Sequence, residues 1–496
     1  RMTRVLIINS GSSSLKLQIL DTAVEDELAW ALVERIGEPS GILTVRRTDL
    51  TGMPAEERTE EPTIEDHTAA LARVLELADE LEVHPTELGV QAIGHRVVHG
   101  GPDFHEPVLV TPEVEADIEE LELLAPLHNP ANLRGIRVAR DLLPGLPHVA
   151  VFDTGFFHTL PAAAHTYAID RETARRWDLR RYGFHGTSHE FVSHRTAAVL
   201  GRPHGELNQI VLHLGNGASA SAIEAGRAVD TSMGLTPLEG LVMGTRPGDL
   251  DPGLIIHLIR DRGMSPDEVS TLLNRQSGLE GLSGARDFRE LLARVDEDDD
   301  DAVLAYDVVI HRLRRYIGGY WAVLGRVDAI TFTAGVGENS PAVRRRSLAG
   351  LEGLVGSKHQ HVRPNVLGPP AIATTYGAGH ALLGQCKAHL SLDGLHRLVE
   401  RDLERRPGRD ILLAVIGLGR HNARNLGREG PLVRVGQQPA RGVGQPFGHR
   451  HGIQSARCQR LAGLKGIDRC VGPASGARQR RLDRERRDQR LLLVDR

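Results

Sequence analysis

Short apolar runs alternate with turns rich in glycine and serine along the first part of the chain. Residues 5–8 are apolar and mostly β-branched, residues 9–14 are small and polar, and residues 15–20 alternate apolar with polar positions. This pattern predicts two strands joined by a tight turn, a β-hairpin. Residues 209–223 repeat the scheme, with Gly217 in the place of Gly11. Because such turns between strands are common, the repeat indicates a duplicated domain without establishing one.

Longer stretches between and after the two hairpins alternate between helical and strand patterns. Ser340-Pro341 predicts the start of a further helix, because proline is well suited to a first helical turn. Strands that alternate with helices indicate an α/β architecture. Helical spacing covers residues 63–81, 190–200 and 301–324, and buried strands are predicted over residues 90–98, 148–152 and 329–334.

Charge divides the chain of 496 residues into two unlike parts. The formal net charge is −5, but residues 1–355 carry −20 and residues 356–496 carry +15. All three cysteines follow residue 355, and Lys16 is the only lysine before it. Two different kinds of sequence are therefore joined near residue 355.

Several protein classes are excluded by what the first 355 residues lack. Without cysteine, they cannot form a disulfide scaffold or a thiolate metal site. No apolar run has the length of about 18 residues that a membrane helix needs. The N-terminus enters a strand pattern without the apolar segment of a signal peptide. We therefore expect a cytoplasmic protein with no membrane partner.

Three glycine-containing turns follow apolar strands, at residues 9–14, 215–219 and 335–339. Turns of this kind expose backbone N–H groups, which favour phosphate, especially where a helix follows. None has the spacing of a P-loop or of a dinucleotide fingerprint. Together they predict nucleotide binding of another kind.

Charged side chains lie in unusual glycine-rich surroundings. Arg96 and Arg246 are each flanked by glycines, which suits a bidentate grip on carboxylate or phosphate, although a surface ion pair is the alternative. Asp153 ends a buried strand, where it either orients a metal or substrate or caps a turn. The spacing of His185 and His189, like that of His95 and His99, is compatible with zinc. We reject zinc because Gly186 disfavours the helix that would align the pair and no third ligand is evident; a histidine that donates to a developing charge fits better.

Read together and in order, these segments resemble the acetate kinase family. The resemblance implies a duplicated pair of RNase H-like, actin-like ATPase α/β domains with a nucleotide cleft between them. It also implies a homodimer, Mg²⁺ as cofactor, and the reaction ATP + acetate ⇌ ADP + acetyl phosphate. The segments that carry it are residues 9–16, 94–101, 125–130, 152–154, 183–189, 213–219, 243–252 and 332–340.

The family's functional residues carry over by motif position. The resemblance implies Asn9 as a residue near Mg²⁺ and Arg96 as the acetate carboxylate ligand. It implies Asp153, His185 and Arg246 as catalytic residues. The pocket for the acetate methyl group would consist of Val98, Leu127, Phe184 and Pro237. The nucleotide-binding residues would be Ser12, Ser14, Lys16, His213, Leu214, Gly215, Asn216, Gly217, Asp287, Phe288, Arg289, Gly335, Val336, Gly337, Glu338 and Asn339.

The chemistry of phosphoryl transfer supports these roles. The attacking carboxylate and the γ-phosphate are both anionic, and Arg96 and Arg246 would offset their repulsion. His185 could donate to an oxygen of the transferring group. Acetate is already ionised at neutral pH, so Asp153 is expected to position substrate or metal rather than abstract a proton. An extra methylene changes binding by only about 1–3 kcal/mol, so propionate is expected to be a poorer substrate, and a propionate kinase of the same family is an alternative.

The family pattern breaks near residue 355. The predicted domains are residues 1–155, residues 156–355 and an arginine- and glycine-rich tail over residues 356–496. In the tail we find neither the further strand of the family nor the late glutamate that is a family Mg²⁺ ligand. We interpret the tail as out-of-frame translation; a genuine basic appendage that binds nucleic acid or another polyanion is the alternative. The corresponding alternative function is a catalytically impaired nucleotide-binding protein with a basic interaction tail.

Overall fold

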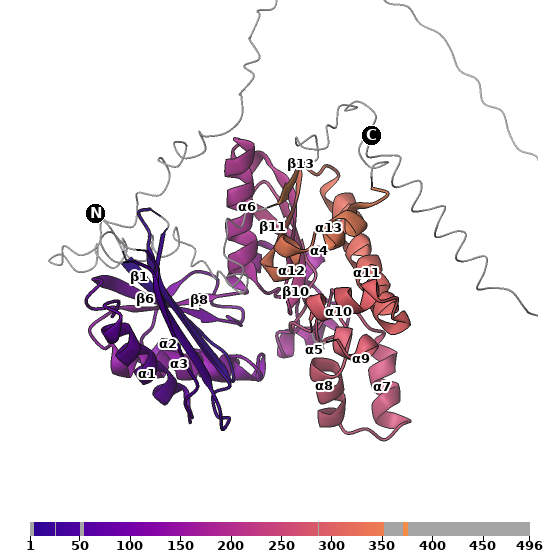
Figure 1. The fold of residues 1–496 in the computed structure, drawn as a ribbon. Coiled ribbons are helices and arrows are strands. Elements are labelled where there is room, and N and C mark those ends of the chain that lie inside the picture. The colour runs from indigo at the N-terminus through magenta and orange to yellow at the C-terminus, as the bar shows by residue number, and fades with distance from the viewer. Residues whose placement is uncertain (1–3, 25, 50–53, 286, 352–370, 375–496) are drawn as a thin grey trace, which may run out of the picture. The chain divides into compact units, whose positions relative to one another are not determined.

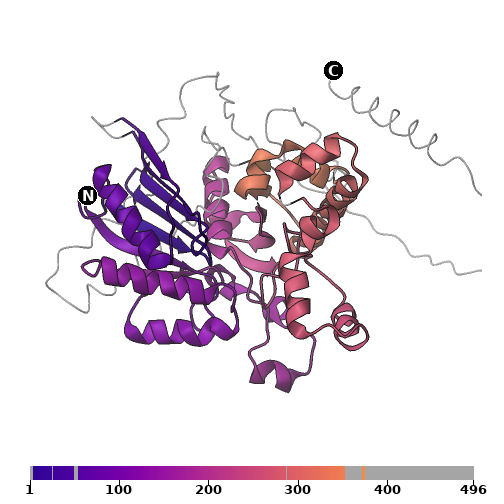
Figure 2. The ribbon, with the colours of Figure 1, turned by 60° about the horizontal axis from the view of Figure 1, so that its bottom comes forward.

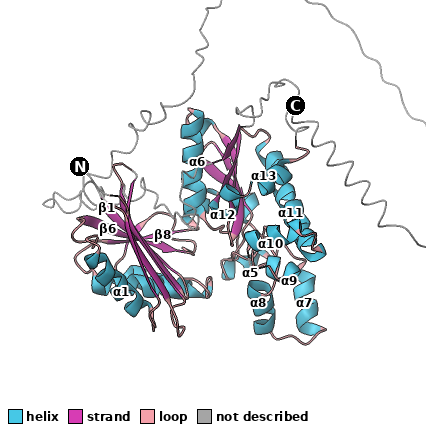
Figure 3. Ribbon diagram, viewed as in Figure 1, coloured by secondary structure: helices cyan, strands magenta, loops and turns pink. Residues whose placement is uncertain are grey.

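The computed structural model describes residues 4–24, 26–49, 54–285, 287–351 and 371–374, which form two β-sheets and the helices packed on them (Figure 1, Figure 3). Each predicted hairpin forms the antiparallel part of one sheet. The fold is thus built around the two repeats that the sequence pattern predicts.

The first sheet has eight strands in the order β5-β4-β3-β2-β1-β6-β8-β7. β1 pairs antiparallel with β2, and β1, β6 and β8 are parallel neighbours. The carboxyl ends of these three strands therefore lie at one edge of the sheet. The strands are β1 (Arg4–Ser10), β2 (Ser14–Asp21), β3 (Asp26–Glu34), β4 (Ile42–Arg47), β5 (Glu56–Glu60), β6 (Val90–Val97), β7 (Val108–Leu109) and β8 (His148–Phe152).

Two helices bury one face of this sheet. Leu6 and Ile8 of β1 share a hydrophobic cluster with Leu71 of α1 (His67–Glu80) and Ala139 of α3 (Asn129–Leu142). Because side chains alternate along a strand, Val5 and Ile7 face the other way. α2 (Pro112–Glu120) packs on α3, and Figure 1 shows α1, α2 and α3 on the same side of the sheet.

The second sheet repeats the centre of the first. Its order is β11-β10-β9-β12-β13, with β9–β10 and β10–β11 antiparallel and β9–β12 and β12–β13 parallel. The strands β3-β2-β1-β6-β8 have the same order and the same directions. The duplication predicted from the hairpins is therefore confirmed. The strands are β9 (Asn208–Leu214), β10 (Ala218–Glu224), β11 (Arg227–Thr231), β12 (Ala329–Thr333) and β13 (Ala371–Thr374).

β13 corrects one expectation. The sequence predicts no further family strand after residue 355, whereas β13 pairs with β12 along its whole length, from Ala329↔Ala371 to Phe332↔Thr374. It takes the place in the second sheet that β8 takes in the first. All three cysteines lie outside the described residues, and so does the apolar run at residues 411–416, where the sequence pattern permits a further strand. The domain boundaries at residues 155 and 355 and the origin of the tail stay predictions.

Helices cover both faces of the second sheet (Figures 1 and 2). Ile210 and Leu212 share a cluster with α11 (Asp300–Leu324), whereas Val211 packs with Val192 of α6 (Gly186–Leu200). None of the helices in the described part of the chain is long and apolar enough to cross a membrane. The remaining helices are α4 (Ala162–His165), α5 (Arg171–Arg176), α7 (Pro252–Arg260), α8 (Pro266–Arg275), α9 (Gly278–Ser283), α10 (Phe288–Asp296), α12 (Ala334–Asn339) and α13 (Pro341–Leu348).

Two local predictions differ from the structure. Gly186 is expected to disfavour a helix, yet α6 begins at Gly186, with His185 as its N-cap in the left-handed conformation (φ 60°). The glycine-rich segment at residues 335–339 is expected to be a turn, but it forms the short helix α12. At α6 the glycine allows close packing at the helix start. α13 begins at Pro341 with Ser340 as N-cap, as predicted.

Candidate active site

The carboxyl ends of β1, β6 and β8 bring Asn9, Arg96 and Asp153 together. The Nε of Arg96 donates to both carboxylate oxygens of Asp153, at 3.0 and 3.1 Å, and its Nη2 donates to Oδ2 at 2.5 Å. Its Nη1 donates to Asn9 Oδ1 at 3.4 Å. Asp153 is only 1% exposed. One guanidinium thus connects the ends of all three parallel strands.

The amino end of α3 fixes the backbone that follows β6. Asn132 Oδ1 accepts from the Val98 N–H at 3.0 Å, and Asn129 Oδ1 accepts from the His99 N–H at 3.1 Å. The Nδ2 of Asn132 donates to the Ser10 carbonyl at 2.7 Å. Both asparagines are buried, so these amides replace water as partners for the strand ends. This is the physical role of the asparagine in the segment at residues 125–130.

The start of α6 lies directly against the end of β8. The Gly186 N–H donates to the Asp153 carbonyl at 2.8 Å. A Cβ at Gly186 would lie 2.2 Å from that oxygen, a distance that only glycine permits. His185 immediately precedes Gly186 and is the left-handed N-cap of α6. His185 is held beside Asp153 as a result.

Neutral histidines gather around His185. The ring of His185 stacks on that of His213, with centroids 4.3 Å apart. Burial, followed by the proximity of His213, holds the pKa of His185 well below its usual range. Burial also lowers the pKa of His213 to about 4. These rings are therefore uncharged hydrogen-bonding groups at neutral pH.

His128 belongs to the same group, although the sequence motif gives it no assigned role. Burial lowers its pKa to about 4, with further contributions from Arg246, Arg96 and, in the opposite direction, Asp153. These interactions place the ring among the three charged residues of the candidate site. The signal in the sequence is its position immediately before Asn129 and Pro130.

Arg246 approaches the same group from the loop between β11 and α7. Its Nη1 donates to the Pro237 carbonyl at 2.6 Å. A Cβ at Gly217 would lie 2.9 Å from Nη2 of Arg246 and 3.5 Å from Nε2 of His185. Burial lowers the pKa of Arg246 to about 10, so it keeps its positive charge at neutral pH. The predicted catalytic residues Asp153, His185 and Arg246 are thus brought together.

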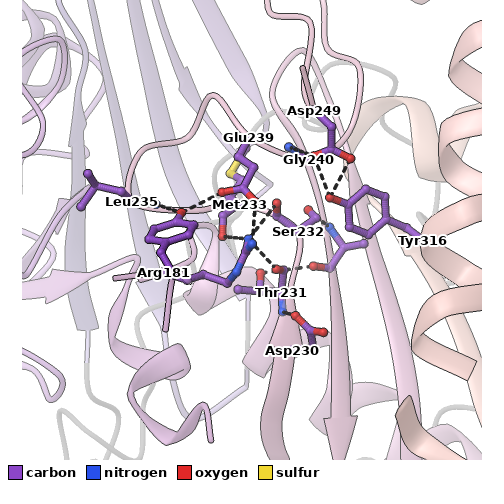
Figure 4. A network of polar contacts seen from close by, with 12 residues as sticks. Arg181, Asp230, Thr231, Ser232, Met233, Leu235, Glu239, Gly240, Asp249 and Tyr316 are labelled. Carbon is purple, nitrogen blue, oxygen red and sulfur yellow. Dashed lines mark hydrogen bonds and ion pairs between the residues drawn. The ribbon is translucent and has the colours of Figure 1, made fainter. Parts of the chain in front are cut away.

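A polar network braces the loop that carries Arg246, as Figure 4 shows. Arg181 donates to the carbonyls of residues 231, 232 and 233 at 2.9–3.3 Å and to Glu239 at 2.5 Å. The hydroxyl of Tyr316 donates to both carboxylate oxygens of Asp249, at 3.0 and 3.2 Å. The network fixes the loop on either side of Arg246. The sequence patterns miss Arg181, Glu239 and Tyr316, because their partners lie far away along the chain.

Two of the three predicted phosphate-binding segments are neighbours. In the turn between β9 and β10, the Gly215 N–H donates to the Gly217 carbonyl at 3.0 Å. A Cβ at Gly215 would lie 3.7 Å from the Cβ of Ala334, the first residue of α12. Glu338 stabilises α12 by accepting from the Ala334 N–H at 3.2 Å. The segments around Gly215 and Gly335 therefore form one surface.

Other predicted nucleotide residues have local structural roles. Asp287 caps α10 and pairs with Arg289 at 2.7 Å, while the Arg289 side chain is 93% exposed. Phe288 packs on the core of the second sheet. Ser12, Ser14 and Lys16 lie on the β1–β2 hairpin, whose turn is closed by the Gly11 N–H and the Ser14 carbonyl at 2.8 Å.

The predicted methyl pocket is assembled in part. Val98 and Phe184 are buried in one hydrophobic cluster. Pro237 lies beside Arg246, whose Nη1 donates to the Pro237 carbonyl. Leu127 is 47% exposed and is not a member of that cluster. Three of the four residues thus lie near the catalytic group.

The oxygen donors at the site suit Mg²⁺. No group of three or more His, Cys, Asp or Glu side chains among the described residues could hold a metal. Mg²⁺ usually takes one or two protein oxygens and completes its shell with water and phosphate. Asn9 and Asp153 present such oxygens side by side on Arg96.

Duplicated sheets of this order, with paired arginines and neutral donors at the strand ends, define a phosphotransferase of the actin-like ATPase fold. The chain belongs to the acetokinase family, whose model matches residues 4–378. It is 60% identical to an acetate kinase of Streptomyces coelicolor over 354 residues, which are 71% of this chain and 86% of that protein. It is 57% identical over 375 residues to an acetate kinase of Streptomyces avermitilis, covering 74% of this chain and 91% of that protein.

Solved structures agree with this assignment. A crystal structure of Porphyromonas gingivalis acetate kinase superposes with a TM-score of 0.67 at 38% identity, covering 75% of this chain and 96% of that chain. A propionate kinase from Francisella tularensis gives a TM-score of 0.66 at 36% identity, covering 71% and 89%. The family match to residue 378 includes β13, which supports its place in the second sheet.

Proposed function

We propose that this chain is an acetate kinase that transfers the γ-phosphoryl group of ATP reversibly to acetate, in the cytoplasm, giving acetyl phosphate and ADP. The observation that carries the proposal is the convergence of Arg96, Asp153, His185 and Arg246 at the ends of strands and helices from both repeats. Relatives named acetate kinase, at 56–60% identity, support the substrate.

Each of the four residues has a separate task in this reaction. Arg96 carries its positive charge at the strand ends, where it would attract and orient the acetate carboxylate for attack. Arg246 carries a desolvated positive charge, which would stabilise charge on the transferring phosphoryl group. His185 is neutral and would donate a hydrogen bond to the same group. Asp153 would position Arg96 without taking a proton, because acetate is already ionised.

Mg²⁺ and the nucleotide would bind next to these four residues. Asn9 and Asp153 would supply oxygen ligands to Mg²⁺, which when bound neutralises phosphate charge. The surface formed by residues 215–217 and α12 would receive the nucleotide phosphates. The buried positions of Val98 and Phe184 support a small acyl pocket, in which propionate would bind less well than acetate.

We also propose a homodimer with α7 in its interface. α7 has no buried residue, although Leu254, Ile256 and Ile259 are 38–56% exposed. Apolar side chains that stay this exposed around a helix are typical of a protein–protein contact. A second copy of the chain would bury it.

Incubation of the full chain with ATP, Mg²⁺, acetate and hydroxylamine tests the activity, because acetyl phosphate is trapped as acetyl hydroxamate. We expect hydroxamate in proportion to the ADP formed, and its loss in Arg246→Ala. Arg137→Ala is the matched control, since Arg137 is 46% exposed and pairs with Glu115 on the helix surface of the first domain. Nucleotide binding without any hydroxamate would favour the catalytically impaired alternative.

A further inference from the structure

A second histidine lies behind His185, on the side away from the reacting groups. His185 is the left-handed N-cap of α6, and His189 lies in the first turn of that helix. Ser219 and Ser221 are two residues apart on β10, so they project from one face of that strand. The start of α6 and β10 thus each contribute two polar side chains to this place.

Hydrogen bonds connect these four side chains in a single series. Ser219 Oγ lies 2.9 Å from Nδ1 of His185 and 2.7 Å from Nε2 of His189. Ser221 Oγ lies 2.7 Å from Nδ1 of His189. Ser219, His189 and Ser221 have no exposed surface, so no solvent molecule competes for these positions.

The series permits only two arrangements of protons. Burial holds the pKa of both histidines well below the usual range, so each ring carries a single N–H. Ser219 has one hydrogen and can donate to only one of the two rings. If Ser219 donates to His185, His189 must donate to Ser219 through Nε2 and accept from Ser221 at Nδ1. If Ser219 donates to His189, every bond in the series is reversed.

The two arrangements have opposite consequences for His185. In the first, Nδ1 is an acceptor and Nε2 carries the hydrogen. In the second, Nε2 is a bare lone pair. The position of a Cβ at Gly217, 2.9 Å from Arg246 Nη2 and 3.5 Å from His185 Nε2, places Nε2 on the side of Arg246. A lone pair there would repel a phosphoryl oxygen, whereas an N–H would bind it.

We propose that Ser219 and His189 are positioning residues that hold His185 in the tautomer with its hydrogen on Nε2. Ser221 terminates the series by donating to His189. The role of the series in turnover rests on the phosphotransferase activity proposed above. The tautomer itself is a property of the folded chain and can be measured without turnover.

Substitution of the two central residues tests the proposal kinetically. Ser219→Ala removes the donor to Nδ1, and we expect kcat to fall at least tenfold while both KM values stay within about threefold. His189→Gln keeps an N–H that can reach Ser219, whereas the shorter His189→Asn does not. We expect the Gln variant to stay within about threefold of wild type in kcat and the Asn variant to fall as far as Ser219→Ala.

Ser193→Ala is the matched control. Ser193 also lies on α6, is buried, and bonds a histidine, with Oγ 2.9 Å from Nε2 of His204, but that contact lies outside the series. We expect its kinetics to be unchanged. Wild-type kcat in Ser219→Ala, or equal losses in the Gln and Asn variants, would overturn the proposal.

A spectroscopic measurement on the wild-type protein tests the tautomer of His185 even if the Ser219 and His189 variants do not fold. In ¹⁵N-histidine-labelled wild-type protein, protonated and bare imidazole nitrogens have distinct shifts, and the signals that disappear in His185→Gln belong to His185. A protonated Nε2 supports the series, and a protonated Nδ1 refutes it. If the wild type forms no acetyl phosphate, the proposed function fails, and this spectrum still decides the tautomer.

Discussion

Replacement of Gly186 by alanine is the sharpest test of how the site is assembled. The added Cβ would lie 2.2 Å from the Asp153 carbonyl oxygen and 3.0 Å from the Cβ of Phe156. An ordinary contact of this kind is at least about 3.4 Å, so the start of α6 must move away from β8 by about 1 Å. The Gly186 N–H bond to the same carbonyl would lengthen with it.

This displacement acts on His185, the neighbouring residue. Misplacement of a catalytic group by about 1 Å can reduce turnover about 100-fold. Overpacking of a buried contact costs about 1–3 kcal/mol of stability, which a chain of this size can tolerate. We therefore expect Gly186→Ala to fold, with a lower melting temperature, and to lose about two orders of magnitude in kcat.

The assay is hydroxamate formation at saturating acetate and ATP, together with thermal unfolding. Gly318→Ala is the control, because Gly318 lies inside α11 with nothing within 4 Å of its Cβ position. Alanine in a helix is preferred to glycine by about 1 kcal/mol, so that variant should be active and slightly more stable. A folded Gly186→Ala variant with kcat within threefold of wild type would refute the argument that this contact sets the position of His185.

Three further predictions follow from the same geometry. Arg96→Lys keeps a positive charge beside buried Asp153 but loses the planar guanidinium. The KM for acetate should therefore rise at least tenfold, while the KM for ATP changes less than twofold. Equal changes in the two KM values would contradict the assigned role. Burial lowers the pKa of His99 to about 4, so the unfolded chain binds the extra proton first as the pH falls below about 6.5. Urea titrations at pH 5 should therefore show that the free energy of unfolding has fallen by about 2 kcal/mol through this residue alone. His99→Gln should remove that part of the pH dependence, and an unchanged dependence in the variant would disprove the argument. Ile256→Glu on α7 should shift sedimentation from dimer to monomer while Val199→Glu, on the exposed side of α6, should not; a dimeric Ile256→Glu protein would exclude α7 from the interface.

The two hairpins were predicted well from the sequence because a hairpin is determined by the residues within it. Alternation of apolar and polar residues with period two, ended by glycine and serine, determines a strand and its turn without reference to the rest of the chain. β13 was missed for the opposite reason. Its four residues have little pattern of their own and form a strand by pairing with β12. Composition separated residues 356–496 as a block, but sheet pairing extends past residue 355.

Site residues were predicted by type and by motif, and their contacts were not. Arg96 and Asp153 could be placed at strand ends from the sequence. The bidentate bond between them depends on the register of β6 and β8, which is set across 57 residues. Arg181 and Tyr316 have no local signal, because the loop that they brace is brought to them only by the fold.

The segment from Gly183 to His189 shows why a dense motif can be located without being understood. Gly183 has φ +77°, and a Cβ there would lie 2.6 Å from the ring of Phe157; Gly186 must approach Asp153; and His189 bonds to Ser219 and Ser221. Each requirement has its partner more than 20 residues away, on η2 (Gly155–Thr159), at the end of β8 or on β10. The two histidines have a spacing that is compatible with zinc when read alone, but both bond to serines on a facing strand. What looks like one local signature is thus a set of separate tertiary contacts that meet around the start of α6. Substitutions at Gly183, Gly186 and His189 should therefore impair the protein for different, separable reasons.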